Sequence, residues 1–233
     1  MPTNIPTTDR VVTVCFAPGT DADWFSASEI VNDLMAANGT PARRYHVRHR
    51  KLIGWITRWF GYFLLDAARK FGAITLAAGG RKGRLDLNGT AAKAANEARL
   101  RYRAFCNHIA ATTRPARTWE DFLAQHHADP AKVSLAEARR RFENQPRVLA
   151  MLGYAGAYTF DPYELAVYQA DEATYVNLHW RIALVGDALI TTDGRLMEPA
   201  SPSMADRLRF LNDATRYLRS LRSAARLCAV VIS

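Results

Sequence analysis

The pattern of hydrophobic and polar positions predicts a strand followed by a helix near the start of the chain. Residues 10–18 (RVVTVCFAP) are rich in β-branched residues and end at a Pro-Gly pair, which is typical of a strand stopped by a turn. Ser26 and Glu29 then have the spacing of a helical capping box, and apolar residues recur at helical intervals up to an Asn-Gly pair. We expect an N-terminal strand–helix unit and, in residues 43–50, a short edge strand.

A long apolar run rich in aromatic residues follows (LIGWITRWFGYFLL). We expect a helix over about 51–70, because Lys51, Arg58 and Arg69 fall on one narrow stripe and apolar residues fill the other faces. The apolar part, 52–65, is shorter than the about 20 residues that a membrane-spanning helix needs, so no transmembrane span is predicted. A buried core helix is the favoured interpretation. Peripheral contact with an anionic membrane and a partner-binding helix are the alternatives.

Beyond this run the pattern predicts a loop, a long helix and a linker. The pairs Gly79-Gly80 and Asn88-Gly89 in residues 77–90 indicate a basic surface loop, which has neither of the known phosphate-loop spacings. Residues 90–111 are rich in alanine and arginine and predict a long helix. In residues 112–118 (TTRPART) an arginine precedes a proline, and the net charge changes sign there. We therefore divide the chain into 1–118 and 119–233, which are either two domains or two parts of one shared core.

The second part begins as helices and then becomes richer in strand-forming residues. Capping boxes at the start of 118–127 and of 134–145 predict a helical hairpin. Residues 164–199 are interpreted as β-rich, with a hairpin turn at Asp193-Gly194. An amphipathic stretch over 201–227 predicts a long helix before a last strand. The expected fold is α+β and mostly helical, with an N-terminal strand–helix unit and a C-terminal β-hairpin followed by a long helix.

The net charge of +9 is distributed unevenly along the chain. Residues 41–118 hold seventeen basic and three acidic residues, a net charge of +14, whereas 1–40 carries −4 and 119–233 carries −1. Such a concentration of positive charge predicts nucleic acid or another polyanion as the partner. The residues expected to carry these contacts are Arg44, Arg48, Arg50, Arg81, Lys82, Arg84, Arg101 and Arg103.

Further features limit how such binding would work. Tyr45, His46 and Tyr102 are candidates for stacking on bases. The sequence contains no zinc-finger spacing, no RNP sequence and no clear helix-turn-helix, so sequence-specific reading is not predicted. A solvated basic face, or arginines paired with the acidic outer segments, is the alternative interpretation.

Signals for catalysis, metals and cofactors are weak. The three cysteines are far apart and form no CxxC pair, which indicates buried, inert thiols in a reducing cytosol: Cys15, Cys106 and Cys228. The histidines lack metal-ligand spacing and no cofactor motif is present, so no metal and no cofactor are expected. If an acid–base site exists, we expect it at His179 with Asp187 and Glu172. The alternative is that His179 is a satisfied histidine within a sheet.

These observations favour a non-catalytic accessory or regulatory protein over an enzyme. It would bind nucleic acid, or machinery that handles nucleic acid, through its basic middle segment. The excess of arginine over lysine suggests a bacterial source, and the N-terminus shows no secretory signal, so we expect a cytoplasmic location. One alternative is a protein-interaction or inhibitor module that blocks a partner complex, for example in secretion or DNA transfer. Another is an enzyme with an unrecognised site.

Overall fold

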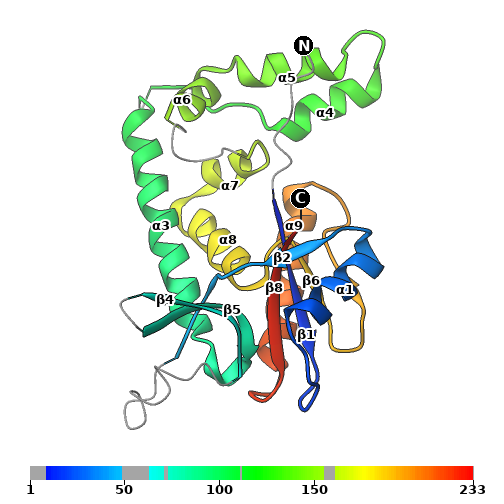
Figure 1. Ribbon diagram of the computed structural model, residues 1–233. Helices are drawn as coiled ribbons and strands as arrows, with labels where there is room; N and C mark the ends of the chain where they lie inside the picture. The colour runs from blue at the N-terminus through cyan, green and yellow to red at the C-terminus, as the bar shows by residue number, and fades with distance from the viewer. Residues whose placement is uncertain (1–8, 49–62, 71–72, 111, 155–160, 233) are drawn as a thin grey trace. The chain divides into compact units, whose positions relative to one another are not determined.

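The computed structural model describes the chain over residues 9–48, 63–70, 73–110, 112–154 and 161–232 (Figure 1). Its fold is α+β, which confirms the predicted class. Two compact units can be distinguished. Unit 1 comprises Met1–Lys93, Trp180–Ala200 and Arg209–Ser233, and unit 2 comprises Ala94–His179 and Ser201–Leu208. The division at residue 118 stays a prediction, and each unit is described by itself below.

Unit 1 is built on one mixed sheet of eight strands among the described residues. Its central order is β3 (Tyr45–His46), β5 (Ala73–Arg81), β8 (Arg226–Ile232), β1 (Arg10–Phe16), β6 (Ala188–Ile190) and β7 (Leu196–Met197). In addition, β2 (Gly39–Pro41) pairs with β8, and β4 (Leu64–Lys70) pairs with β5. Strands β1 and β6 are parallel, and β1 and β8 are antiparallel over seven residue pairs. The N- and C-terminal strands of the chain therefore lie side by side in the centre of the sheet.

The predicted N-terminal strand–helix unit is present as β1 and α1 (Trp24–Met35). The helix begins earlier than expected, because the carboxylate of Asp23 accepts a hydrogen bond from the backbone N–H of Ser26 at 2.8 Å. Ser26 lies inside the helix, so the predicted capping box is wrong and Asp23 is the cap. The helix ends at Met35, and the C-cap residue Ala36 has a left-handed φ of 52°.

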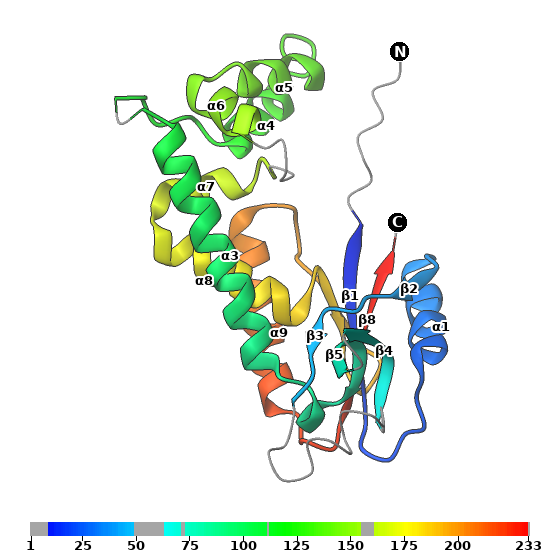
Figure 2. The same cartoon turned by 60° about the vertical axis from the view of Figure 1, so that its left-hand side comes forward.

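Apolar side chains on one face of the sheet pack against α1. This core contains residues of β1, β6 and β8 together with Ala27 and Val31 of the helix. Figure 2 shows α1 on one side of the sheet and α9 (Met204–Ser220) on the other. The buried residues of α9 in this unit include Leu211, Ala214 and Leu218. Helices thus cover both faces, which explains why strands β1 and β8 are almost completely buried.

Tyr45 belongs to this core. It is completely buried, and its hydroxyl lies 2.9 Å from Oγ1 of Thr13 and donates to the carbonyl oxygen of Leu184 at 3.1 Å. A ring with no exposed surface cannot stack on a base, so the stacking role expected for Tyr45 is wrong. The hydroxyl instead links β1, β3 and the end of α8 (Glu172–Val185).

The prediction of a helix over about 51–70 is wrong within the residues that the structure describes. Leu64–Lys70 is the strand β4, which pairs with β5, whereas 51–62 lies outside the described residues. A continuous apolar run has no period of its own, so it is compatible with a strand as well as a helix. Within the described ranges, no helix is long and apolar enough to cross a membrane.

The two predicted turn signals, Gly79-Gly80 and Asn88-Gly89, lie inside regular elements. Gly79 and Gly80 belong to β5, where a Cβ on Gly79 would lie 2.0 Å from the carbonyl oxygen of Leu227. Gly79 therefore permits close approach of β8 and does not form a loop. Gly89 lies in the first turn of α3 (Leu87–His108), and its N–H donates to the carboxylate of Asp86. The long helix predicted over 90–111 is confirmed as α3.

The prediction for the C-terminal part is correct for the hairpin and the long helix and wrong for residues 164–185. The hairpin at Asp193-Gly194 joins β6 to β7, and Gly194 has a φ of 80°. The long helix is α9, followed by β8. The β-rich interpretation of 164–185 is wrong, because this segment forms the helices α7 (Glu164–Ala170) and α8. Its β-branched and aromatic residues have only a small intrinsic penalty in a helix, and tertiary packing overrides it.

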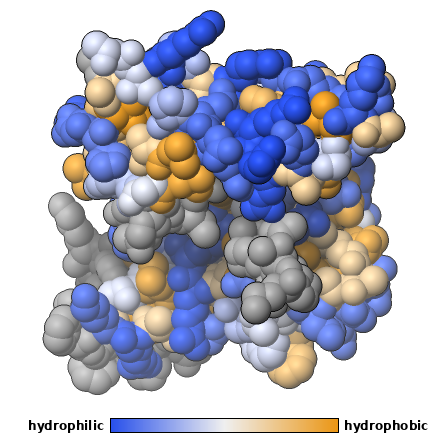
Figure 3. All heavy atoms as spheres, turned by 90° about the horizontal axis from the view of Figure 1, so that it is seen from above, coloured by the Kyte–Doolittle hydropathy of each residue, from blue (hydrophilic) through white to orange (hydrophobic). Residues whose placement is uncertain are grey.

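Unit 2 is helical in its described residues. The predicted helical hairpin is α4 (Trp119–Ala128) and α5 (Leu135–Glu143), and α6 (Pro146–Tyr154) follows. The capping box of Thr118 and Asp121 is complete, and Ser134 accepts a hydrogen bond from the N–H of Glu137. The rings of Phe122 and Phe142 pack 6.1 Å apart across the hairpin. Figure 3 shows separate hydrophobic areas among hydrophilic residues on the face seen from above.

Candidate functional site

The eight basic residues predicted to bind a polyanion do not form one group. Five of them are in unit 1 and two are in unit 2, while Arg50 lies outside the described residues. The residues in unit 1 are Arg44, Arg48, Arg81, Lys82 and Arg84, and those in unit 2 are Arg101 and Arg103.

The segment 81–84 lies beside the C-terminal end of α9. The ammonium group of Lys82 donates to the carbonyl oxygens of Arg219 and Leu221, at 2.9 and 2.6 Å. The backbone N–H of Gly83 donates to the carbonyl oxygen of Ser223 at 2.9 Å. The last carbonyls of a helix lack intrahelical partners and carry partial negative charge, so a cation is favourable there. These contacts bring the exposed Arg219 and Arg222 next to 81–84.

Arg48 joins the same group through the backbone. Its N–H donates to the carbonyl oxygen of Arg84 at 2.8 Å, next to an antiparallel bridge between Val47 and Leu85. Arg48 is exposed and Arg84 is half-buried, with a buried Nε that has no hydrogen-bond partner among the described residues. We call the resulting cluster the basic end of unit 1, and its members are Arg48, Arg81, Lys82, Arg84, Arg219 and Arg222.

Positive groups are close to one another at this end. Arg81 is directly opposite Arg226 in the pairing of β5 with β8. Burial, and then the charge of Arg219, lower the pKa of Arg181. Burial also lowers the pKa of Lys82. Like charges on opposite residues of two strands, such as Arg81 and Arg226, repel each other and are unfavourable for the fold.

Acidic residues do not compensate this charge. In the part of the chain that the structure describes, no carboxylate lies within ion-pair distance of any of the six residues of the basic end. The neighbouring Arg226 does have an acidic partner, the fully exposed Asp21 at 3.5 Å. Two members of the basic end contact aromatic rings, Arg81 that of Phe63 and Arg219 that of Trp180.

The other predicted binding residues are engaged within the fold. Arg44 donates to the carbonyl oxygen of Ile182, near the end of α8. Arg103 lies 3.6 Å from the carboxylate of Glu172, which also pairs with Arg99 at 3.2 Å. The positive charge of Arg101 acts on the buried Glu164. Arg44 and Arg103 therefore contact protein groups of opposite or partial negative charge, and Arg103 has a carboxylate partner, which the residues of the basic end lack among the described residues.

Two members of the basic end, Arg219 and Arg222, were not predicted from the sequence. They belong to residues 119–233, whose net charge is close to zero, and their position depends on contacts across 137 residues or more with Lys82. The available signal was the set of basic residues in the last turns of an amphipathic helix. That signal alone does not show what the helix end contacts.

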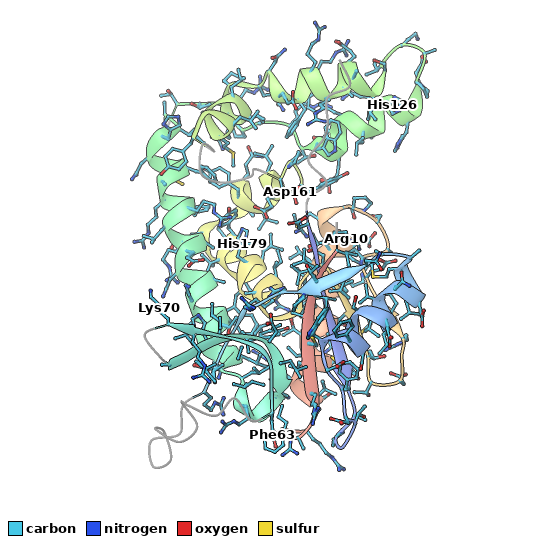
Figure 4. All side chains as sticks on the ribbon, in the orientation of Figure 1. Arg10, Phe63, Lys70, His126, Asp161 and His179 are labelled. Atoms are coloured by element: carbon cyan, nitrogen blue, oxygen red, sulfur yellow. The ribbon has the colours of Figure 1, made fainter. Side chains whose placement is uncertain are left out.

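The candidate acid–base residues each have a partner. His179 lies in the helix α8 and not in a sheet, with Nε2 3.4 Å from Oε2 of Glu164 (Figure 4). Tyr175 donates its hydroxyl hydrogen to the same carboxylate at 3.5 Å. The carboxylate of Asp187 accepts from the N–H of Val11 at 2.9 Å, and that of Glu172 pairs with arginines of α3 as described above.

Glu164 and His179 form a buried polar cluster in unit 2. Burial raises the pKa of Glu164, but the adjacent His179, followed by the charges of Arg207 and Arg101, lowers it by more. The carboxylate is therefore ionised at neutral pH although only 11% of its side chain is exposed. Nε2 of His179 lies within ion-pair distance of the Glu164 carboxylate, but the two groups do not have the geometry of a hydrogen bond. The arrangement accounts for a structural role of Glu164, because the hydroxyl of Tyr175 and the ring of His179 lie next to its buried carboxylate.

The cysteines partly match the expectation of buried, inert thiols. Burial raises the pKa of both Cys15 and Cys228 to about 12. Cys106 is exposed, in contrast to the prediction, because it faces outward from α3, and its Sγ lies 3.6 Å from the hydroxyl of Tyr168. Among the described side chains, no group of three or more His, Cys, Asp or Glu residues is arranged to hold a metal ion.

The function has to be inferred from this geometry. A comparison with protein-family models gives no match, and comparisons with curated proteins and with solved structures give no significant match.

Proposed function

We propose that the protein is a non-catalytic accessory protein that binds nucleic acid through the basic end of unit 1. One observation carries this proposal. Six cationic side chains from three separate chain segments gather at one end of the sheet, and no carboxylate among the described residues pairs with any of them. The cytoplasmic and bacterial setting inferred from the sequence is part of the same proposal.

The chemistry of the basic end suits phosphate groups. A guanidinium offers two parallel N–H donors to a phosphate, and each phosphate contact releases a counterion from the nucleic acid. Binding would also remove the repulsion among cations that the fold now tolerates. None of the described elements presents a recognised base-reading motif, so we expect affinity that depends on charge and little on sequence.

A titration of a fluorescently labelled oligonucleotide with nuclease-treated protein, followed by fluorescence anisotropy, tests the proposal. We expect saturable binding that unlabelled nucleic acid competes away, at low and at physiological salt. The absence of saturable binding at low salt would overturn the proposal.

A protein partner is the second candidate, and exposed apolar side chains of unit 2 favour it. Leu135 of α5 and Leu149, Leu152 and Tyr154 of α6 are each more than one third exposed. Apolar groups of this size on a surface are a frequent feature of protein interfaces. Recovery of one stable protein partner from nuclease-treated lysate, lost when Leu149 and Leu152 are replaced by serine, would favour this second function.

A further inference from the structure

Arg81 and Phe63 form a stacked pair at the basic end. The guanidinium carbon of Arg81 lies 3.6 Å from the centre of the Phe63 ring. Phe63 is 45% exposed, which is unusual for a large aromatic residue, and Figure 4 shows it at the end of the sheet where β8 begins. The pair therefore combines a planar cation and an aromatic ring at the surface, beside the other cations of the basic end.

The backbone around this pair holds it in a defined position. The N–H of Arg81 donates to the carbonyl oxygen of Phe63 at 2.9 Å. Gly80 has a φ of 144°, and a Cβ on this residue would lie 2.3 Å from the same carbonyl oxygen. Glycine at position 80 is thus required for the close approach that puts Phe63 beside Arg81.

Phe63 also has a strained backbone conformation. Its φ of 65° lies in the left-handed region, where a bulky aromatic residue is rarely found and where strain is typically about 1–3 kcal/mol. Strained residues persist where the surrounding structure enforces them, and they are concentrated at functional sites. The exposed ring, the strained backbone and the stacked arginine all belong to the same residue.

We infer that the Phe63–Arg81 pair is a platform for stacking a base, and that the ligand of the basic end is a single-stranded nucleic acid. This inference rests on the proposed function and adds the class of ligand. A duplex hides the faces of its bases, whereas a single strand presents them next to its phosphates. Bases stack on aromatic rings and on guanidinium planes, while the neighbouring cations hold the strand backbone.

The binding site then has two kinds of contact. Arg48, Lys82 and Arg84 neutralise phosphates, and the Phe63–Arg81 pair contacts a base. Only the second contact depends on the presence of bases, so a strand without bases separates the two. Stacking of one base on such a platform corresponds to an affinity gain of about tenfold.

The experiment compares three ligands of equal length: a single-stranded oligonucleotide, the same strand with abasic sites throughout, and a duplex. For the wild-type protein we expect the base-containing strand to bind about tenfold more tightly than the abasic strand, and more tightly than the duplex. Phe63→Leu should abolish the difference between the base-containing and abasic strands and leave the affinity for the abasic strand unchanged. Arg81→Lys, which keeps the charge and loses the planar group, should reduce the same difference.

Phe25→Leu is the matched control, because Phe25 is 59% exposed on α1 and the substitution is the same. We expect no change in affinity for any of the three ligands. Equal binding of base-containing and abasic strands by the wild-type protein, or tighter binding of the duplex, would overturn the inference while the proposed function stands. If none of the three ligands binds, both the inference and the proposed function are wrong.

Discussion

Replacing Arg48, Arg84 and Arg222 together by glutamine removes half of the positive charge of the basic end. These three are chosen because the other members have additional contacts. Lys82 donates to carbonyl oxygens at the end of α9, and Arg81 and Arg219 contact aromatic rings. Glutamine keeps a long polar side chain, so the variant tests charge with little change in shape.

The expected loss of affinity follows from the number of charges removed. Each neutralised phosphate of a single strand contributes about 0.7 to the slope of log K against log salt, which at physiological salt corresponds to about fourfold in affinity. Three lost contacts should therefore weaken binding by about 50-fold, or about 2 kcal/mol. Fluorescence anisotropy with a labelled single-stranded oligonucleotide measures this change.

A second triple variant provides the control. Arg139, Arg140 and Arg141 of α5 are also arginines, but each pairs with Glu137 or Glu143. Their replacement by glutamine changes the net charge of the protein by the same amount, and we expect less than a twofold effect on affinity. Equal losses in the two variants would show that only net charge matters, and would refute the assignment of binding to the basic end.

Three further predictions concern stability. Burial raises the pKa of Glu164, but His179 and two arginines lower it by more, so the pKa in the folded state lies below its ordinary value of 4.5. The ionised carboxylate therefore stabilises the fold above pH 4.5, and this contribution is lost as the pH falls through the folded-state pKa. The difference in Tm between wild type and Glu164→Gln should therefore be largest at neutral pH and shrink below pH 4.5. Tyr45→Phe leaves Oγ1 of Thr13 and the carbonyl oxygen of Leu184 without their partner, so it should lower the free energy of unfolding by about 1–3 kcal/mol in urea titrations. The control Tyr154→Phe, at an exposed site, should have little effect. Gly79→Ala places a Cβ 2.0 Å from a carbonyl oxygen of β8 and should destabilise the fold strongly. Gly153→Ala, whose Cβ would have no described atom within 4 Å outside its own helix and its chain neighbours, should be neutral or stabilising by up to about 1 kcal/mol.

Opposite outcomes would contradict these predictions one by one. A Tm difference for Glu164→Gln that does not change with pH would mean that its ionised form contributes nothing to stability. Equal effects of the two tyrosine substitutions would show that the hydroxyl of Tyr45 is not bonded as described. A Gly79→Ala variant as stable as the wild type would contradict the close approach of β5 and β8.

Local signals in the sequence predicted much of the fold. The Thr118–Asp121 capping box places the start of α4, and the Asp193-Gly194 turn places the β6–β7 hairpin. Both signals depend on interactions within four or five residues, so a sequence contains all the information needed. Helix α3 and helix α9 were found for a similar reason, because their periodic apolar positions repeat over several turns.

The errors come from contacts between distant segments. The Gly79-Gly80 pair is typical of a turn, but glycine is needed at position 79 because the carbonyl oxygen of Leu227, far away in the chain, leaves no room for a Cβ. The apolar run that includes β4 has no period that distinguishes a helix from a strand, and pairing with β5 decides its conformation. Helix α8 was mistaken for strands because packing overrides the weak preference of its β-branched and aromatic residues.

The candidate site was predicted only in part, because contacts between distant segments decide which basic residues gather there. A count of charges along the chain identified 81–84 as basic, and these residues are part of the basic end. The count could not show that Arg103 is paired with Glu172 or that Arg219 lies beside Lys82. Both facts depend on tertiary contacts, and they decide which arginines are available to a ligand.

The salt dependence of binding tests the central claim most directly. The affinity of the wild-type protein for a single-stranded oligonucleotide is measured at a series of NaCl concentrations from low to physiological. If the five cations of the basic end other than Arg81 contact phosphates, log K falls linearly with log salt, with a slope of about −3.5. An affinity that stays constant over this range would contradict the claim that this end of unit 1 binds nucleic acid.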